Sequence, residues 1–205
     1  MEDYRLHCGF SLTQNTISIN LPGWVTEELS SKPETYPTIE DRMRLIIELS
    51  QRNIDHETGG PFAAGVFEEE TGKLVSIGVN RVMPLNCSSA HAEIVALSMA
   101  QRKLGTFDLG GPGLPSHQLV VNWRPCLMCY GAVIWSGVRS LVIAGSGPEL
   151  ESITGFDEGP FSDNWVEELE KRGISVVDGV LTEEAMKVFH SFKEKGMFVY
   201  NSRHG

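Results

Sequence analysis

The chain of 205 residues has few cysteines, a deficit of basic residues and no long apolar run. Its four cysteines show no disulfide framework, and such usage is typical of a reducing cytosol. Lys and Arg number 17 against 27 Asp and Glu, and the net charge of -10 disfavours nucleic acid as a partner, because that binding relies on clustered basic side chains. Residues 1–10 lack a secretory signal pattern, and no segment approaches the length of a membrane span. We therefore expect a soluble, cytoplasmic protein without membrane contact.

The hydrophobic pattern predicts an N-terminal arm followed by one domain. Residues 1–37 contain three prolines and little periodicity, so we expect an irregular arm with a short strand over 16–21 and assign it no function. Residues 38–205 form the expected domain, with segment 145–163 as a surface loop that carries function. The expected elements of this domain are helices over 38–58, 90–104, 125–135, 164–172 and 182–195, and strands over 62–69, 73–80, 118–122, 140–144 and 174–177. A hairpin followed by strand–helix alternation indicates a three-layer α/β/α fold with a mixed central sheet.

Two short motifs carry most of the chemical information. The first is His91-Ala92-Glu93, and the second is segment 125–129, which reads Pro-Cys-Leu-Met-Cys. Together they supply one imidazole and two thiols, a ligand set that zinc prefers and that leaves a fourth position open for water. The sequence therefore predicts a catalytic zinc whose protein ligands are His91, Cys126 and Cys129.

Helical geometry supports the pairing of the two motifs. Cys126 and Cys129 lie three residues apart, so a helix with Pro125 at its first position presents both thiols on one face. His91 and Glu93 lie two residues apart and would diverge by about 200° inside a helix, so both reach one metal only from the end of a helix. We therefore expect two helix N-termini to meet at the metal.

A structural zinc is the alternative interpretation of the same residues. Cys87 lies four residues before His91 and could supply a fourth ligand, which would close the site. Glu93 would then have no role, and closed sites of this kind are usually built into small modules rather than across a long α/β stretch. We therefore favour an inert Cys87, and the sequence assigns no role to Cys8.

The pattern His-x-Glu followed by Pro-Cys-x-x-Cys resembles the zinc-dependent cytidine/deoxycytidylate deaminase superfamily. Within that superfamily the resemblance is closest to bacterial guanine deaminases and covers about residues 38–205. The other segments that carry it are 59–64, 78–80, 131–135 and 155–158. The resemblance implies hydrolytic deamination of an aminated nucleobase, guanine to xanthine and ammonia, with Glu93 as the group that moves the proton.

The same resemblance implies roles for residues outside the two motifs. Phe62 would stack on the base, Asn80 would hydrogen-bond its polar edge, and Glu158 or Asp157 would close the pocket as a second acidic group. Without the family, Phe62 would be an ordinary strand residue and the others turn or solvated residues. Glu158 is our second candidate catalytic residue. The remaining predicted substrate contacts are Ala92 and Trp123.

The resemblance also implies a homodimer in which a C-terminal segment, here residues 198–200, helps to complete the partner's active site. One position departs from the family pattern: the residue before Pro125 is usually Glu, whereas this chain has Arg124 there, preceded by the bulky Trp123. Because this loop lines the pocket in relatives, another aminated heterocycle remains open as substrate, such as an aminotriazine like ammeline, a modified purine or a nucleoside. A tRNA- or DNA-editing deaminase and a non-catalytic zinc-stabilised binding protein are further alternatives, disfavoured by the charge and by Glu93.

Overall fold

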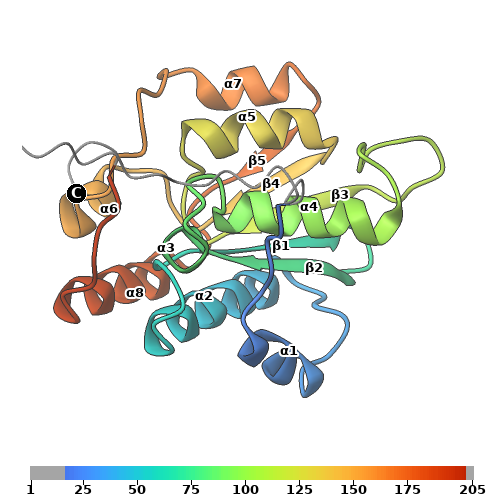
Figure 1. Cartoon of the computed structure of the whole chain (residues 1–205). Coiled ribbons are helices and arrows are strands. Elements are labelled where there is room, and N and C mark those ends of the chain that lie inside the picture. Colours follow the sequence, from blue (N-terminus) through green and yellow to red (C-terminus); the bar gives the residue numbers. More distant parts are fainter. Residues whose placement is uncertain (1–16, 202–205) are drawn as a thin grey trace, which may run out of the picture.

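The computed structural model describes residues 17–201 and places five strands in one mixed sheet of order β2-β1-β3-β4-β5 (Figure 1). Strand β1, second in this order, pairs antiparallel with β2 and with β3, whereas β3, β4 and β5 are parallel. The strands are β1 (Ala63–Glu68), β2 (Leu74–Val79), β3 (His117–Val121), β4 (Ser140–Ile143) and β5 (Ser175–Val177). The mixed sheet predicted from the sequence is confirmed.

Helices cover both faces of the sheet, which makes three layers (Figure 1). Helices α2 and α8 pack on one face, with α1 beside them, and α4, α5 and α7 pack on the other. The helices are α1 (Gly23–Ser30), α2 (Ile39–Asp55), α3 (Val82–Leu85), α4 (Ala92–Leu104), α5 (Leu127–Ser136), α6 (Glu149–Thr154), α7 (Trp165–Glu170) and α8 (Thr182–Glu194). No helix in the described part of the chain is long and apolar enough to cross a bilayer.

Helix α2 forms where the sequence predicts it, because the start signal and the apolar spacing agree. The Thr38 hydroxyl accepts a hydrogen bond from the Asp41 amide at 3.1 Å and caps the first turn. Met43, Ile46 and Ile54 recur on one face and are fully buried against the sheet. The helix ends at residue 55, earlier than the predicted 58, because the chain turns at residues 56–58 before it enters β1.

Three short helices were not predicted. The prediction of a strand over 16–21 is wrong for residues 17–21, the part that the structure describes, because they form no regular element. Helix α1 lies inside the arm that was expected to be irregular. Helix α6 lies in the expected loop 145–163, and α3 follows β2. Helices this short carry too little periodicity to be read from a sequence and depend on tertiary packing, such as that of fully buried Val25 in α1. The division at residue 37 stays a prediction.

One end of the sheet gathers the residues of interest. Because β1 runs antiparallel to β2 and β3, the residue before β1 and the residues that follow β2 and β3 lie at the same end. These are Phe62, Asn80 and the Asn122–Trp123 pair. Glycine is needed nearby, since a Cβ on Gly78 would lie 2.0 Å from the carbonyl oxygen of Ala92. Gly78 thus lets the first turn of α4 lie directly on the sheet.

Candidate active site

His91, Cys126 and Cys129 come together at this end of the sheet, although His91 and Cys126 are 35 residues apart in the chain. Their ligand atoms all lie within 4.8 Å of one another, and the Cys126 Sγ is 3.5 Å from the His91 Nδ1. Zinc bonds to nitrogen and sulfur are about 2.0–2.3 Å long, so atoms this close can share one ion. Within the described residues, this is the group of side chains that could hold a metal.

The N-termini of α4 and α5 position the three side chains, as predicted. His91 is the N-cap of α4 and Cys126 the N-cap of α5, while Cys129 lies in the first turn of α5. One detail was wrong: Pro125 was expected at the first helical position but precedes the N-cap, because Cys126 keeps an extended backbone (φ -63°, ψ 169°). The positive ends of both helices therefore face the metal ligands and favour a thiolate there.

The two thiols have opposite acidities. A hydrogen bond from Cys129, helped by His91, lowers the pKa of Cys126 to about 4. The same hydrogen bond and burial raise the pKa of Cys129 well above its ordinary value. Cys126 is therefore a thiolate at neutral pH even in the absence of a cation, which suits a metal ligand.

Cys87 stands apart from this group. Its sulfur is 3.3 Å from the Ser89 hydroxyl, and its side chain is partly exposed. It does not belong to the cluster of His91, Cys126 and Cys129, so these residues present an open three-ligand set. Cys8 lies outside the described residues.

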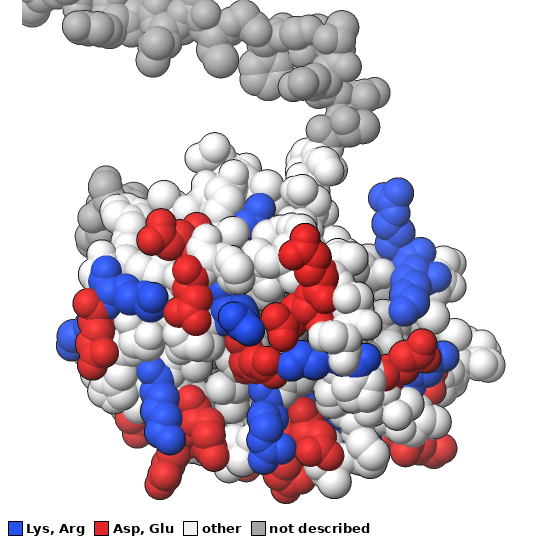
Figure 2. All heavy atoms as spheres, turned by 90° about the horizontal axis from the view of Figure 1, so that it is seen from below, with Lys and Arg blue, Asp and Glu red and all other residues white. Residues whose placement is uncertain are grey.

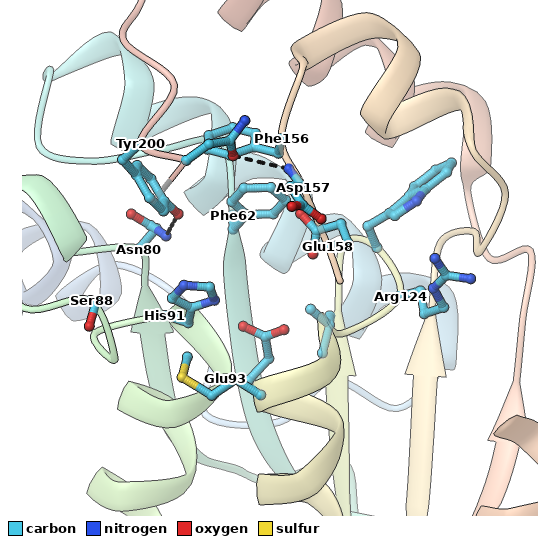
Figure 3. Close-up of a pocket in the computed structure, with 14 residues that line it drawn as sticks. Phe62, Asn80, Ser88, His91, Glu93, Arg124, Phe156, Asp157, Glu158 and Tyr200 are labelled. Carbon is cyan, nitrogen blue, oxygen red and sulfur yellow. Dashed lines mark hydrogen bonds between the residues drawn. The ribbon is translucent and has the colours of Figure 1, made fainter. Parts of the chain in front are cut away.

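A pocket of about 340 Å³ opens at His91, one of the three ligand residues (Figure 3); Cys126 and Cys129 do not line it. Most residues that the sequence predicted as site residues line it: Phe62, Asn80, His91, Glu93, Trp123, Asp157 and Glu158. Ala92 does not line the pocket, because it is fully buried under the first turn of α4. Lining residues that the sequence analysis did not identify are Ser88, Val121, Met128, Phe156 and Asn201.

Two carboxyl groups in the pocket titrate near neutrality. Glu93 is 6% exposed, and its burial raises its pKa to about 7. Burial, followed by the negative charge of Cys126, raises the pKa of Glu158 to about 8. The Glu158 backbone is fixed on both sides, because its carbonyl accepts from the Leu127 amide at 3.0 Å and its amide donates to the Glu151 carboxylate at 3.3 Å. The two groups can hold or release a proton at physiological pH.

Asn80 is held in one orientation by its neighbours. Its side-chain oxygen accepts a hydrogen bond from the Gly60 amide at 3.2 Å, which directs the amide nitrogen toward the Tyr200 hydroxyl. The residue is 1% exposed, and its NH₂ group is the donor that faces the pocket (Figure 3). Phe62 forms the wall beside it, with its ring 5.3 Å from that of Phe156 in an edge-to-face arrangement.

The C-terminal segment lies over the pocket of its own chain. The Tyr200 ring is 5.0 Å from the Phe156 ring and 6.1 Å from the His91 ring. Asn201 ties the segment down, because its side chain donates to the Gly155 carbonyl at 2.7 Å and accepts from the Asp157 amide at 3.0 Å. The family resemblance implied that residues 198–200 lie near a partner's site, and that arrangement stays a prediction.

Trp123 and Arg124, the pair that departs from the family pattern, both line the pocket. Trp123 is 3% exposed, packs edge-on against Phe189 at 5.3 Å and donates to the Gly147 carbonyl at 3.3 Å. The guanidinium carbon of Arg124 lies 4.3 Å from the centre of the Phe161 ring. Both side chains are thus held by packing.

Comparison with known proteins places the chain in a family. Residues 37–145 match the model of the cytidine and deoxycytidylate deaminase zinc-binding region. The solved structure of guanine deaminase from Nitrosomonas europaea is 47% identical, covers 87% of this chain and 97% of its own, and has a TM-score of 0.82. A structure of NE0047 in complex with 2,6-diaminopurine is also 47% identical, covers 91% of this chain and 97% of its own, and has a TM-score of 0.83.

Two further relatives are more distant. Guanine deaminase of Bacillus subtilis is 27% identical over 144 residues, which are 70% of this chain and 87% of that protein. The tRNA-specific adenosine deaminase of Buchnera aphidicola is 32% identical over 133 residues, which are 65% of this chain and 79% of that protein. The arrangement of the zinc-ligand residues at two helix N-termini and the similarity to these proteins indicate the same family. The chain belongs to the cytidine and deoxycytidylate deaminase family of zinc-dependent aminohydrolases.

Proposed function

We propose that the chain is a guanine deaminase, which converts guanine and water to xanthine and ammonia. The observation that carries this proposal is one pocket that His91 lines, beside the metal-ligand cluster of His91, Cys126 and Cys129. It also contains two carboxyl groups that titrate near neutrality and the oriented amide of Asn80. The similarity to solved guanine deaminases over most of the chain supports the same substrate.

The donor set of one imidazole and two thiols fits zinc, and His91, Cys126 and Cys129 would hold it. When bound, zinc lowers the pKa of a water ligand to about 7. Glu93 takes a proton from the attacking water and delivers it to a ring nitrogen next to the carbon that bears the amine. Glu158, whose pKa burial raises, gives its proton to the departing amine and regains one as the new carbonyl forms.

The pocket suits a single base. Its volume of about 340 Å³ lies near the lower end of the usual range for ligand pockets. Phe62 offers an aromatic surface, and the Asn80 amide donates to a ring acceptor. The carboxyl of Glu158 pairs with a donor on the base, of which guanine has several. Trp123 narrows the side of the pocket, so smaller aminated rings such as aminotriazines are the nearest competing substrates.

A tRNA substrate is the second candidate, because the relative from Buchnera aphidicola is a tRNA-specific adenosine deaminase. Asp157 places an acidic side chain in the pocket wall, and Tyr200 and Asn201 line the same pocket, which disfavours a phosphate backbone there. On the face shown in Figure 2, acidic and basic side chains alternate and form no basic patch. Both observations favour the free base.

Ammonia release by the zinc-loaded chain tests the proposal. We expect turnover with guanine, weaker turnover with ammeline and none with adenosine in tRNA. Deamination of tRNA that falls steeply with salt, without turnover of guanine, would replace this proposal with the tRNA function. Turnover of ammeline alone would show that Trp123 and Arg124 have changed the specificity of the pocket.

We also propose a homodimer that uses the outer face of α5. Three apolar side chains of this helix are exposed, with Leu127 at 46%, Met128 at 42% and Trp135 at 85%. Exposed apolar groups clustered on one helix are typical of a surface that another chain covers. Met128 also lines the pocket, so a second copy there would complete the wall. Replacement Trp135→Glu should convert the dimer to a monomer in analytical ultracentrifugation; an unchanged mass would contradict this interface.

The three described cysteines are free thiols, and on this basis we propose a reducing, cytoplasmic location.

A further inference from the structure

Arg124 lies directly before the Pro125–Cys126 pair, and its guanidinium forms no salt bridge with an acidic side chain among the described residues. Its guanidinium carbon stands 4.3 Å from the centre of the Phe161 ring, a distance that permits a cation–π contact. Its buried Nε has no hydrogen-bond partner among residues 17–201, and the side chain lines the pocket. The stack on Phe161 is therefore the contact that fixes this side chain.

Phe161 belongs to the segment that carries Glu158. Residues 155–161 belong to the connection between α6 and α7 and have no regular structure, so backbone ladder hydrogen bonds do not hold them in place. Phe161 also packs edge-on against Tyr130 of α5, with ring centres 5.6 Å apart. The segment is thus attached to α5 and to the turn before it.

A second contact attaches the same segment on the other side of Cys126. The Leu127 amide donates to the Glu158 carbonyl at 3.0 Å, and a Cβ on Gly159 would lie 3.2 Å from the Leu127 Cβ. Gly159 has φ of +84°, a conformation that glycine adopts without strain. The metal ligand Cys126 is therefore flanked by two residues, Arg124 and Leu127, that both hold the segment bearing Glu158.

We infer that Arg124 is a positioning residue for Glu158: its stack on Phe161 holds segment 155–161 against the turn that carries Cys126 and keeps the Glu158 carboxyl in the pocket that His91 lines. Arg124 acts on Glu158 through its contact with the Phe161 ring. The largest charge effects on the Glu158 carboxyl come from Cys126, Glu93, His91 and Glu151. This inference rests on the proposed function, because it assumes that Glu158 takes part in the reaction.

A double-mutant cycle on guanine turnover tests the inference. Arg124→Gln removes the cation and keeps the chain length, while Phe161→Leu removes the ring. We expect each to lower kcat by about 3-fold to 30-fold, the range that a cation–π contact spans, with KM nearly unchanged and one zinc per chain retained. The two changes together should be no worse than either alone, because both break the same contact. Arg124→Lys should retain most of the activity, because an ammonium can also lie over the ring.

The decisive experiment introduces Arg124→Gln into a chain that already carries Glu158→Gln. If Arg124 acts through Glu158, it should not lower the remaining kcat further. Three results would overturn the inference: the same fold-loss in that background, a rise in KM at unchanged kcat, or loss of zinc from Arg124→Gln. Arg44→Gln and Phe107→Leu are matched controls, since the Arg44 side chain is 63% exposed and Phe107 83% exposed. A wild-type chain without guanine turnover would contradict the proposed function instead.

Discussion

Replacement of Glu93 by glutamine is the perturbation that most sharply separates proton transfer from metal binding. Glu93 is the second residue of α4, 6% exposed, and lies two residues beyond the metal ligand His91. Glutamine has the same shape and retains hydrogen bonding, but it cannot carry the proton from water to the ring. We therefore expect the variant to fold, to bind one zinc per chain and to lose turnover.

The expected loss follows from general acid–base catalysis. Such groups contribute about 10² to 10⁴ in rate, which is about 2.7 to 5.5 kcal/mol at about 1.36 kcal/mol per tenfold. The assay is kcat for ammonia release from guanine, with the zinc content of the same sample measured by atomic absorption. A variant that retains zinc and turns over within about tenfold of wild type would refute the role of Glu93.

The pKa of Glu93 gives a second readout in the metal-free protein. Burial raises this pKa from 4.5 to about 7, so the folded state binds more protons than the unfolded state between these values. The free energy of unfolding therefore falls as pH rises from about 4.5 to 7, by at most about 3 kcal/mol. Glu93→Gln removes this term, so it should stabilise the metal-free chain at pH 8 and not at pH 4. Denaturant titrations with equal differences at both pH values would contradict the assigned shift.

Three other variants test separate parts of the structure. Cys87→Ala should keep one zinc per chain by atomic absorption, because its sulfur lies outside the cluster of metal ligands; a stoichiometric loss of zinc would indicate a closed structural site. Asn80→Ala should lower kcat/KM for guanine by about 5-fold to 150-fold, the effect of leaving a buried polar edge unpaired, and unchanged kinetics would exclude Asn80 from the binding of the base. Thr38→Ala should reduce the free energy of unfolding in urea by about 1 kcal/mol through loss of the α2 cap; equal stability would mean that the 3.1 Å hydrogen bond contributes nothing.

Much of the sheet and the metal cluster could be predicted from the sequence, because both depend on local signals. The hairpin of β1 and β2 shows two apolar-rich runs on either side of a turn at Gly72, and α2 shows a cap followed by periodic apolar residues. His91, Cys126 and Cys129 lie at helix N-termini whose signals are equally local. Ligand types, spacing and start signals together were enough to bring the three residues to one site.

The parts that escaped prediction depend on long-range contacts. Tyr200 reaches Asn80 across 120 residues, and Arg124 meets Phe161 from a different loop, and no periodic pattern marks either pair. The side chain of Ala92, a predicted substrate contact, is fully buried in the core, and its contact with substrate stays a prediction. The direction of a side chain at a helix start depends on how the helix is seated on the sheet, which the sequence does not specify.

The central claim is that this chain removes the amine of guanine by hydrolysis, and product analysis in water enriched in heavy oxygen tests it most directly. The zinc-loaded protein should convert guanine to xanthine that carries one heavy oxygen atom, at the carbon that bore the amine, with one ammonia released per xanthine. Mass spectrometry of the purine product and enzymatic measurement of ammonia supply both numbers. Guanine recovered unchanged, or xanthine without the label, would contradict the account.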